Sequence, residues 1–152
     1  IAIDLKIWPK NNAIILYIVD AFTRFTLGIE VKDKKADTIL KPILEEWILK
    51  GFGPPRQIIF DNGKEFSGHE EMAEKLSTYV YFAHPYHSWE RGLNENTNGL
   101  IRQYFTKGSS FENITDEQVQ YVMDKLNHRP RKTLNYKTPH VIFFAESQLK
   151  AA

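Results

Sequence analysis

Hydrophobic residues along the chain are grouped into short runs and longer periodic segments. Runs rich in Ile, Val, Tyr and Phe predict β-strands at residues 1–8, 13–20, 25–32, 57–60 and 79–83. A PKNN segment between the first two runs predicts a turn, so the first three strands are expected to form an antiparallel meander. The run at 57–60 is almost entirely apolar, which is typical of a strand in the middle of a sheet.

Two helices are predicted in the segments between these strands. Apolar residues recur at helical spacing over 37–50, and Asp37 is a suitable N-cap for this segment. Ser67 and Glu70 form a capping-box pattern that predicts a second helix over 67–77.

Three further helices are predicted in the second half of the chain, and the first of them covers 91–105. Thr115 and Gln118 form another capping box, which predicts a helix over 115–127. Thr138 followed by Pro139 predicts the start of a last short helix. The 115–127 helix has an apolar stripe that is expected to be buried, formed by Val119, Val122, Met123 and Leu126.

The resulting order of elements, βββαβαβααα, predicts an α/β fold with a five-stranded mixed sheet and helices on both faces. A chain of 152 residues with 42% hydrophobic and 13% aromatic residues is expected to form one domain, 1–152, with a real core. No run reaches the roughly 18 apolar residues of a membrane helix, so no membrane partner is expected. Cys is absent, which excludes a disulfide framework and a Cys-containing zinc site.

Three acidic residues are candidates for one cluster. Asp4 and Asp61 each follow an apolar, β-branched run, and Glu95 lies within the 91–105 helix. A three-carboxylate cluster is costly unless a cation neutralises it, and oxygen ligands favour Mg²⁺ or Mn²⁺ over zinc. Two such ions about 3.5–4 Å apart catalyse phosphoryl transfer. Asp20, at the end of the second strand, competes with Asp4 for the first position.

Several motifs resemble the catalytic core of retroviral integrases and DDE transposases, in the RNase H-like superfamily. The motifs are DNG at 61–63, PYHSWERGLNENTNG at 85–99, NHRP at 127–130 and KTP at 137–139. The second half of the chain is most similar to bacterial insertion-sequence transposases. IVDAFTRFTLG at 18–28 is the strongest match in the first half.

This resemblance implies an RNase H-like fold and a polynucleotidyl transferase that cuts DNA and joins the cut strand to a target. It implies two Mg²⁺ or Mn²⁺ ions held by Asp4, Asp61 and Glu95. It favours Asp4 over Asp20, because Asp4 precedes the meander. The implied partners are element-end and target DNA, and the implied location is intracellular, at DNA in a bacterial cytoplasm or a nucleus.

Assembly and domain organisation are further expectations. The family acts as a multimer, so a homodimer or higher multimer is expected, with the 37–50 and 115–127 helices as candidate surfaces. The chain begins without Met and has a catalytic candidate at position 4, so we expect it to be the core of a longer protein. The formal net charge is only +1, so flanking domains are expected to supply much of the DNA affinity.

Candidate DNA contacts surround the three acids. On a helical wheel, Asn98 and Arg102 share the face of Glu95, opposite an apolar face formed by Leu93, Thr97, Leu100, Ile101 and Tyr104. The alternative is that the Glu95 face is ordinary solvated surface. Lys64 follows Asp61 closely in the sequence, and Tyr86 and His87 lie in the predicted 85–91 loop, so these three are also candidate DNA contacts. His84 and His87 are not expected to bind zinc, because no second ligand pair has suitable spacing.

A basic segment without acids runs from 125 to 137 and includes Arg129, Arg131 and Lys132. It is either a nucleic-acid contact or a solvated charged surface. Two other functions remain open: an RNase H-like nuclease that only hydrolyses, and a domesticated core that binds DNA or protein without catalysis.

Overall fold

The structure is a computed structural model that describes residues 1–8, 13–31, 45–50, 53–55, 57–60, 70, 73–74, 77–82, 88–105 and 114–151. At 2–8, 13, 88–91 and 146–151 it describes the backbone alone.

The strands follow the predicted positions closely. They are β1 (Ala2–Trp8), β2 (Ala13–Val19), β3 (Thr26–Val31), β4 (Gln57–Phe60) and β5 (Tyr79–Phe82). Hydrogen-bonded neighbours follow the order β3-β2-β1-β4-β5. The first three strands pair antiparallel, which confirms the predicted meander, and β4 and β5 extend the sheet in parallel with β1.

The described helices are α3 (Ser88–Tyr104), α4 (Asp116–Asn127) and α5 (Pro139–Ala151), with a 3₁₀ turn, η2 (Lys132–Leu134), between the last two. The capping box predicted for α4 is present: the Thr115 hydroxyl accepts from Gln118 N, and the Gln118 side chain accepts from Thr115 N. The buried stripe predicted for this helix is also confirmed.

Two helix predictions need correction. The 85–91 segment was expected to be a loop, but α3 already begins at Ser88. Glu90 in the first turn favours this earlier beginning, and a helix tolerates the single Gly92 that follows. The last helix was expected to be short, but α5 has 13 residues, because no Gly or Pro interrupts it after Pro139.

Two other predicted helices fall largely outside the described residues. Of the 37–50 helix the structure describes the helical residues 45–49, and of the 67–77 helix only the helical residues 70, 73 and 74.

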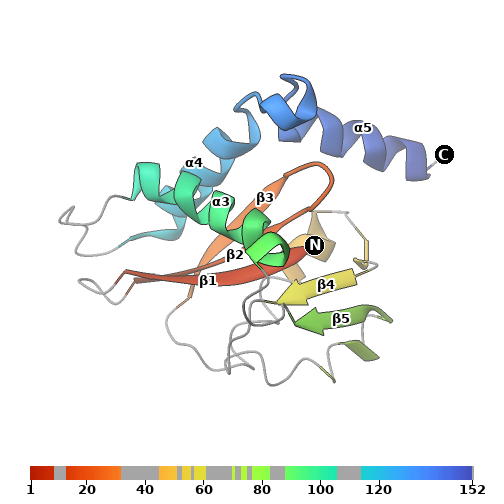
Figure 1. Cartoon of the computed structure of the whole chain (residues 1–152), viewed down its shortest axis with the longest axis horizontal. Helices are drawn as coiled ribbons and strands as arrows, with labels where there is room; N and C mark the ends of the chain where they lie inside the picture. Colours follow the sequence, from red (N-terminus) through yellow and green to blue (C-terminus); the bar gives the residue numbers. More distant parts are fainter. Residues whose placement is uncertain are drawn as a thin grey trace.

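Alternate residues of β2 contribute to two hydrophobic clusters on opposite faces of the sheet. One cluster contains Ile14, Leu16 and Ile18, together with Phe143 of α5 and with Trp47. The intervening Ile15, Tyr17 and Val19 pack in the other cluster, with residues of α3 and α4. Figure 1 shows α3 lying across β1 and β2 with α4 beside it. Because both faces of β2 are buried, the strand is apolar throughout.

Close packing of α4 on β3 depends on a small residue and a pair of hydrogen bonds. A Cβ at Gly28 would lie 2.8 Å from Met123 Cε, so glycine allows this close approach. The Gln120 side-chain amide donates to Gly28 O at 2.7 Å. At the other end of the contact, Asn127 accepts from Thr26 N and donates to Thr26 O, both at 2.8 Å. These contacts fix α4 along β3.

Candidate functional site

The strand position of Asp4 lies beneath helix α3. Asp4 is the antiparallel partner of Tyr17, and directly opposed residues of such a pair lie on one face of the sheet. Tyr17 belongs to the cluster covered by α3 and α4, so Asp4 is placed on that face. The Asp4 side chain lies outside the described residues.

The β1–β4 pairing brings the chain positions next to Asp4 and Asp61 together. Ile3 is in parallel register with Phe60, the residue that precedes Asp61 in the sequence. Asp61 itself lies outside the described part of the chain, as do Lys64, Tyr86 and His87.

Tyr17 joins the sheet to the helix that carries Glu95. Its side chain is fully buried, and its hydroxyl donates a hydrogen bond to the backbone oxygen of Asn94 at 3.2 Å. This bond spans 77 sequence positions and holds α3 at the residue directly before Glu95. The cross-strand partner of Asp4 is therefore in contact with the immediate neighbour of Glu95.

The two faces of α3 have the predicted character. Glu95 and Arg102 are exposed, whereas all five residues of the predicted apolar face, Leu93, Thr97, Leu100, Ile101 and Tyr104, are buried or half-buried. The Thr97 hydroxyl donates to Leu93 O at 2.9 Å, which satisfies this polar group inside the helix. Asn98 was expected on the open face with Glu95, but it is half-buried, and its side-chain oxygen is excluded from solvent.

Asn94 was missed as a site residue at the sequence level. Only 5% of it is exposed, and no hydrogen-bond donor among the described residues reaches its side-chain oxygen. Its spacing of three and seven residues from Thr97 and Ile101 places it on the inward stripe of α3. This spacing could have indicated that Asn94 faces the sheet, but a polar amide side chain is not expected on a buried face.

Asp20, the alternative to Asp4, has a local structural role. Its carboxylate accepts from Thr23 N at 2.7 Å and from the Thr23 hydroxyl at 2.8 Å. These bonds stabilise the turn between β2 and β3, as Asp side chains often do. The Asp20 carboxylate therefore has its hydrogen-bond partners within this turn.

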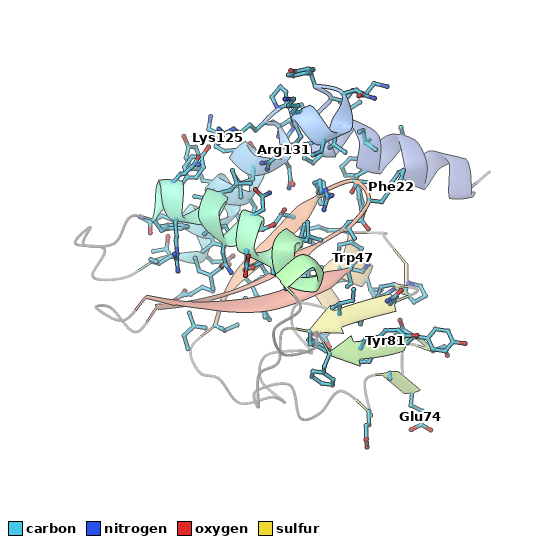
Figure 2. The ribbon with its side chains drawn as sticks, viewed as in Figure 1. Phe22, Trp47, Glu74, Tyr81, Lys125 and Arg131 are labelled. Atoms are coloured by element: carbon cyan, nitrogen blue, oxygen red, sulfur yellow. The ribbon has the colours of Figure 1, made fainter. Side chains whose placement is uncertain are left out.

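The predicted basic segment lies around the C-terminal end of α4, on the side of the molecule away from β4 and β5 (Figure 2). Arg129 donates to the Gln103 side chain at 2.8 Å, and Arg131 donates to Leu126 O at 3.1 Å. Lys132, in η2, is exposed. Burial lowers the pKa of Arg131, and the charges of Arg129 and Arg24 lower it further against an opposing effect of Tyr104.

The oxygen ligands that would suit a divalent cation are carboxylates from β1, from the residue after β4, and from α3. Glu95 presents one of them on the exposed face of a helix whose buried face is fixed to the sheet. Carboxylates of this kind suit Mg²⁺ or Mn²⁺. Within the described residues alone, no group of three or more His, Cys, Asp or Glu could hold a metal ion.

None of the described helices has both the length and the apolar character needed to cross a membrane.

Comparisons with known proteins identify the family of the chain. Residues 2–88 match the family described as integrase core domain. The transposase for insertion sequence element IS4351 of Bacteroides fragilis is 45% identical over 142 residues, which are 93% of this chain and 43% of the relative. Transposase InsI for insertion sequence element IS30A of Escherichia coli K12 is 35% identical over 139 residues, or 91% of this chain and 36% of the relative. The chain thus spans less than half the length of these curated relatives.

Solved structures of low sequence identity share the fold. The catalytic core domain of BIV integrase superposes with a TM-score of 0.76 at 18% identity, covering 99% of this chain and 97% of that one. A chain of the simian T-cell lymphotropic virus intasome, solved in complex with PP2A regulatory subunit B56 gamma, gives a TM-score of 0.76 at 20% identity. The match covers 93% of this chain and 52% of that one. The predicted RNase H-like fold of integrase catalytic cores is thereby confirmed.

Proposed function

Since this chain belongs to the integrase core domain family, we propose that it is the catalytic core of a DNA transposase. It would cut DNA at the ends of a mobile element and join the exposed 3′-OH to target DNA. The transposase relatives support this choice over an enzyme that only hydrolyses and over a non-catalytic core.

One structural relationship carries the proposal. Tyr17, the cross-strand partner of Asp4, hydrogen-bonds to the backbone of the residue before Glu95. The parallel register of Ile3 with Phe60 supports the inclusion of Asp61 in the same site. These two observations support a site formed by a strand residue, the residue after a second strand and a helix residue, which come from distant parts of the sequence.

In this proposal Asp4, Asp61 and Glu95 hold two divalent cations, Mg²⁺ or Mn²⁺. When bound, the ions would supply Lewis acidity to an in-line displacement at phosphorus. Glu95 contributes a ligand from the exposed face of α3, and the Tyr17 hydroxyl fixes this helix to the sheet at the residue before Glu95. No covalent intermediate with the protein is required, so the chain needs no Ser or Cys nucleophile.

The DNA would be held by residues on both sides of these carboxylates. Arg102 lies two turns along α3 from Glu95 and is exposed, which supports a contact with a backbone phosphate. Lys64, Tyr86 and His87 are proposed as DNA contacts because of their positions in the sequence. Asn98 is proposed because it lies one helical turn from Glu95. Three residues at the end of α4 are proposed because of their location: Arg129, Arg131 and Lys132.

The finer architecture and the assembly are part of the same proposal. The observed strand order and the clusters on either side of β2 support a five-stranded mixed sheet with helices on both faces. We expect this core to form one domain of a longer transposase that acts on bacterial DNA inside the cell. Synapsis of two element ends calls for a homodimer or higher multimer.

The decisive experiment uses the full-length transposase with matched element-end DNA and Mn²⁺. Glu95→Gln removes one ligand charge with little change in volume, so cleavage and strand joining should both be lost while the folded state is retained. Lys50→Gln is a suitable control, because it also neutralises one exposed side chain, at a residue that pairs with Glu46 and is not a proposed ligand or DNA contact. Denaturing gels would separate the substrate, cut and joined strands.

Each outcome favours one function. Joining by Glu95→Gln at the parental rate would reject the three-carboxylate assignment. Hydrolysis without joining by the parent would favour the nuclease, and DNA binding without either reaction under Mg²⁺ and Mn²⁺ would favour the non-catalytic core.

A further inference from the structure

Three arginines from two distant parts of the chain come together at the C-terminal end of α4. Arg129 and Arg131 follow the helix, and Arg24 belongs to the turn between β2 and β3. The turn is held against α4 by the two hydrogen bonds between Thr26 and Asn127, and the Thr26 hydroxyl also donates to Arg24 O at 3.1 Å. The closeness of the charges also contributes to the lowered pKa of Arg131.

These positive charges lack compensation within the described part of the chain. None of the three guanidinium groups forms an ion pair with a carboxylate there. The backbone carbonyls at the end of α4 offset only part of the charge, since a helix C-terminus carries about half an elementary charge. One of these carbonyls, that of Leu126, is bonded to Arg131. Like charges packed together without a counter-charge destabilise the folded state, so a bound anion would stabilise it.

Arg131 has a buried donor that no described residue satisfies, and Arg129 has a guanidinium that a ligand can reach. Arg131 is half-buried, and no acceptor among the described residues reaches its Nε, which is itself buried. Arg129 is exposed, and its bond to the Gln103 side chain connects it to α3, the helix of Arg102 and Glu95. Figure 2 shows Arg131 close to α4, away from β4 and β5. A guanidinium fork is suited to bidentate binding of phosphate.

The backbone of Arg24 gives an independent reason to regard this arginine as functional. Its φ angle is 64°, in the left-handed region, and its N–H donates to Asp20 O at 2.9 Å. Positions of this kind at the end of a helical turn are usually occupied by Gly or Asn, since other residues are strained there. The backbone strain at Arg24 supports a role for its side chain.

We propose that Arg24, Arg129 and Arg131 form a binding site for a backbone phosphate of DNA. The proposal rests on the proposed transposase function, and it adds Arg24, which no sequence motif indicated. The contact is with phosphate and not with a base, so it holds the DNA in register without selecting its sequence. It extends the DNA-binding surface from Glu95 along α3, through Arg102 and Gln103, to the end of α4.

The test is the salt dependence of DNA binding by fluorescence anisotropy, with Arg24→Asn as the main variant. Loss of one phosphate contact should lower the magnitude of the slope of log K against log salt by about 0.9. The effect should be the same for unrelated duplex sequences. Because Asn is favoured in the left-handed region, the melting temperature of Arg24→Asn should equal or exceed that of the parent.

Lys50→Asn is the matched control: it removes one positive charge from an exposed residue that is paired with Glu46 at 3.1 Å and is not one of the three arginines. A slope unchanged in Arg24→Asn, or changed equally in both variants, would overturn the phosphate site while leaving the transposase function intact. Absence of DNA binding by the parent would overturn both.

A second arm distinguishes DNA from free phosphate. If inorganic phosphate raises the melting temperature of the parent but not of Arg24→Asn, while both bind DNA with the same slope, the site binds a free anion and the DNA proposal is wrong. Arg24→Lys should retain most of the salt slope, because it keeps the charge and loses only the planar fork.

Discussion

Tyr17 and Asn94 are joined by a hydrogen bond that crosses from the sheet to helix α3. The Tyr17 hydroxyl is the donor, the Asn94 backbone oxygen is the acceptor, and the distance is 3.2 Å. Tyr17 has no solvent exposure and Asn94 has 5%, so the contact lies in the core. The bond determines where along β1 and β2 the helix segment carrying Glu95 is fixed.

Replacement of Tyr17 by Phe should therefore loosen this connection without opening a cavity. Loss of one hydrogen bond should lower the free energy of unfolding by about 0.5–1.5 kcal/mol. Strand joining should fall more than DNA affinity, because Glu95 would be less well fixed while the exposed basic residues are unaffected. Urea unfolding, anisotropy and a joining assay measure the three quantities; equal losses of joining and DNA affinity would indicate a purely structural role.

Divalent metal should stabilise the folded chain if the proposed carboxylate site exists. At a Mn²⁺ concentration one hundred times Kd, the gain should be about 2.7 kcal/mol, because the ion binds only the folded state. EDTA should reverse it. Glu95→Gln should abolish most of this gain while changing the metal-free melting temperature little, since Glu95 is exposed. A full Mn²⁺ shift in Glu95→Gln would argue against Glu95 as a ligand.

The Thr26–Asn127 pair should be a major determinant of how α4 docks. Asn127→Ala would leave both the N–H and the carbonyl of Thr26 without their side-chain partner in a buried contact. An unsatisfied buried group costs about 1–3 kcal/mol, so the free energy of unfolding should drop by at least that amount. Chemical denaturation would measure it. The exposed Thr115→Ala provides a comparison, with an expected loss of about 1 kcal/mol from the N-cap.

Gly28 and Met123 should be energetically coupled. An alanine methyl at position 28 would lie 2.8 Å from Met123 Cε and 3.0 Å from its Sδ. Because these atoms end a flexible side chain that can shift, Gly28→Ala should cost only about 1 kcal/mol through overpacking. Met123→Ala removes these atoms, and the double variant should be more stable than the sum of the two single losses predicts. A double-mutant cycle by urea unfolding would measure this coupling, and strict additivity would contradict the close approach.

Local sequence patterns were sufficient to predict most elements of the fold. The strand positions, the capping box at Thr115 and Gln118, and the apolar stripe of α4 depend on residues that are near one another in sequence. The wheel of α3 correctly separated the exposed Glu95 and Arg102 from the inward stripe. The start of α3 was predicted too late, because the sparsely apolar residues before it lack helical periodicity.

Contacts between distant segments required the tertiary structure. Sequence alone proposed that Asp4, Asp61 and Glu95 share a site, but only strand register and the Tyr17 bond bring the position of Asp4 beneath the helix of Glu95. The burial of Asn94 and the proximity of Arg24 to Arg131 likewise depend on pairing across the sheet and docking of α4. Periodicity reports which face of an element is apolar, because burial acts residue by residue. It carries no information on which other element covers that face, since this depends on chain topology and complementary packing.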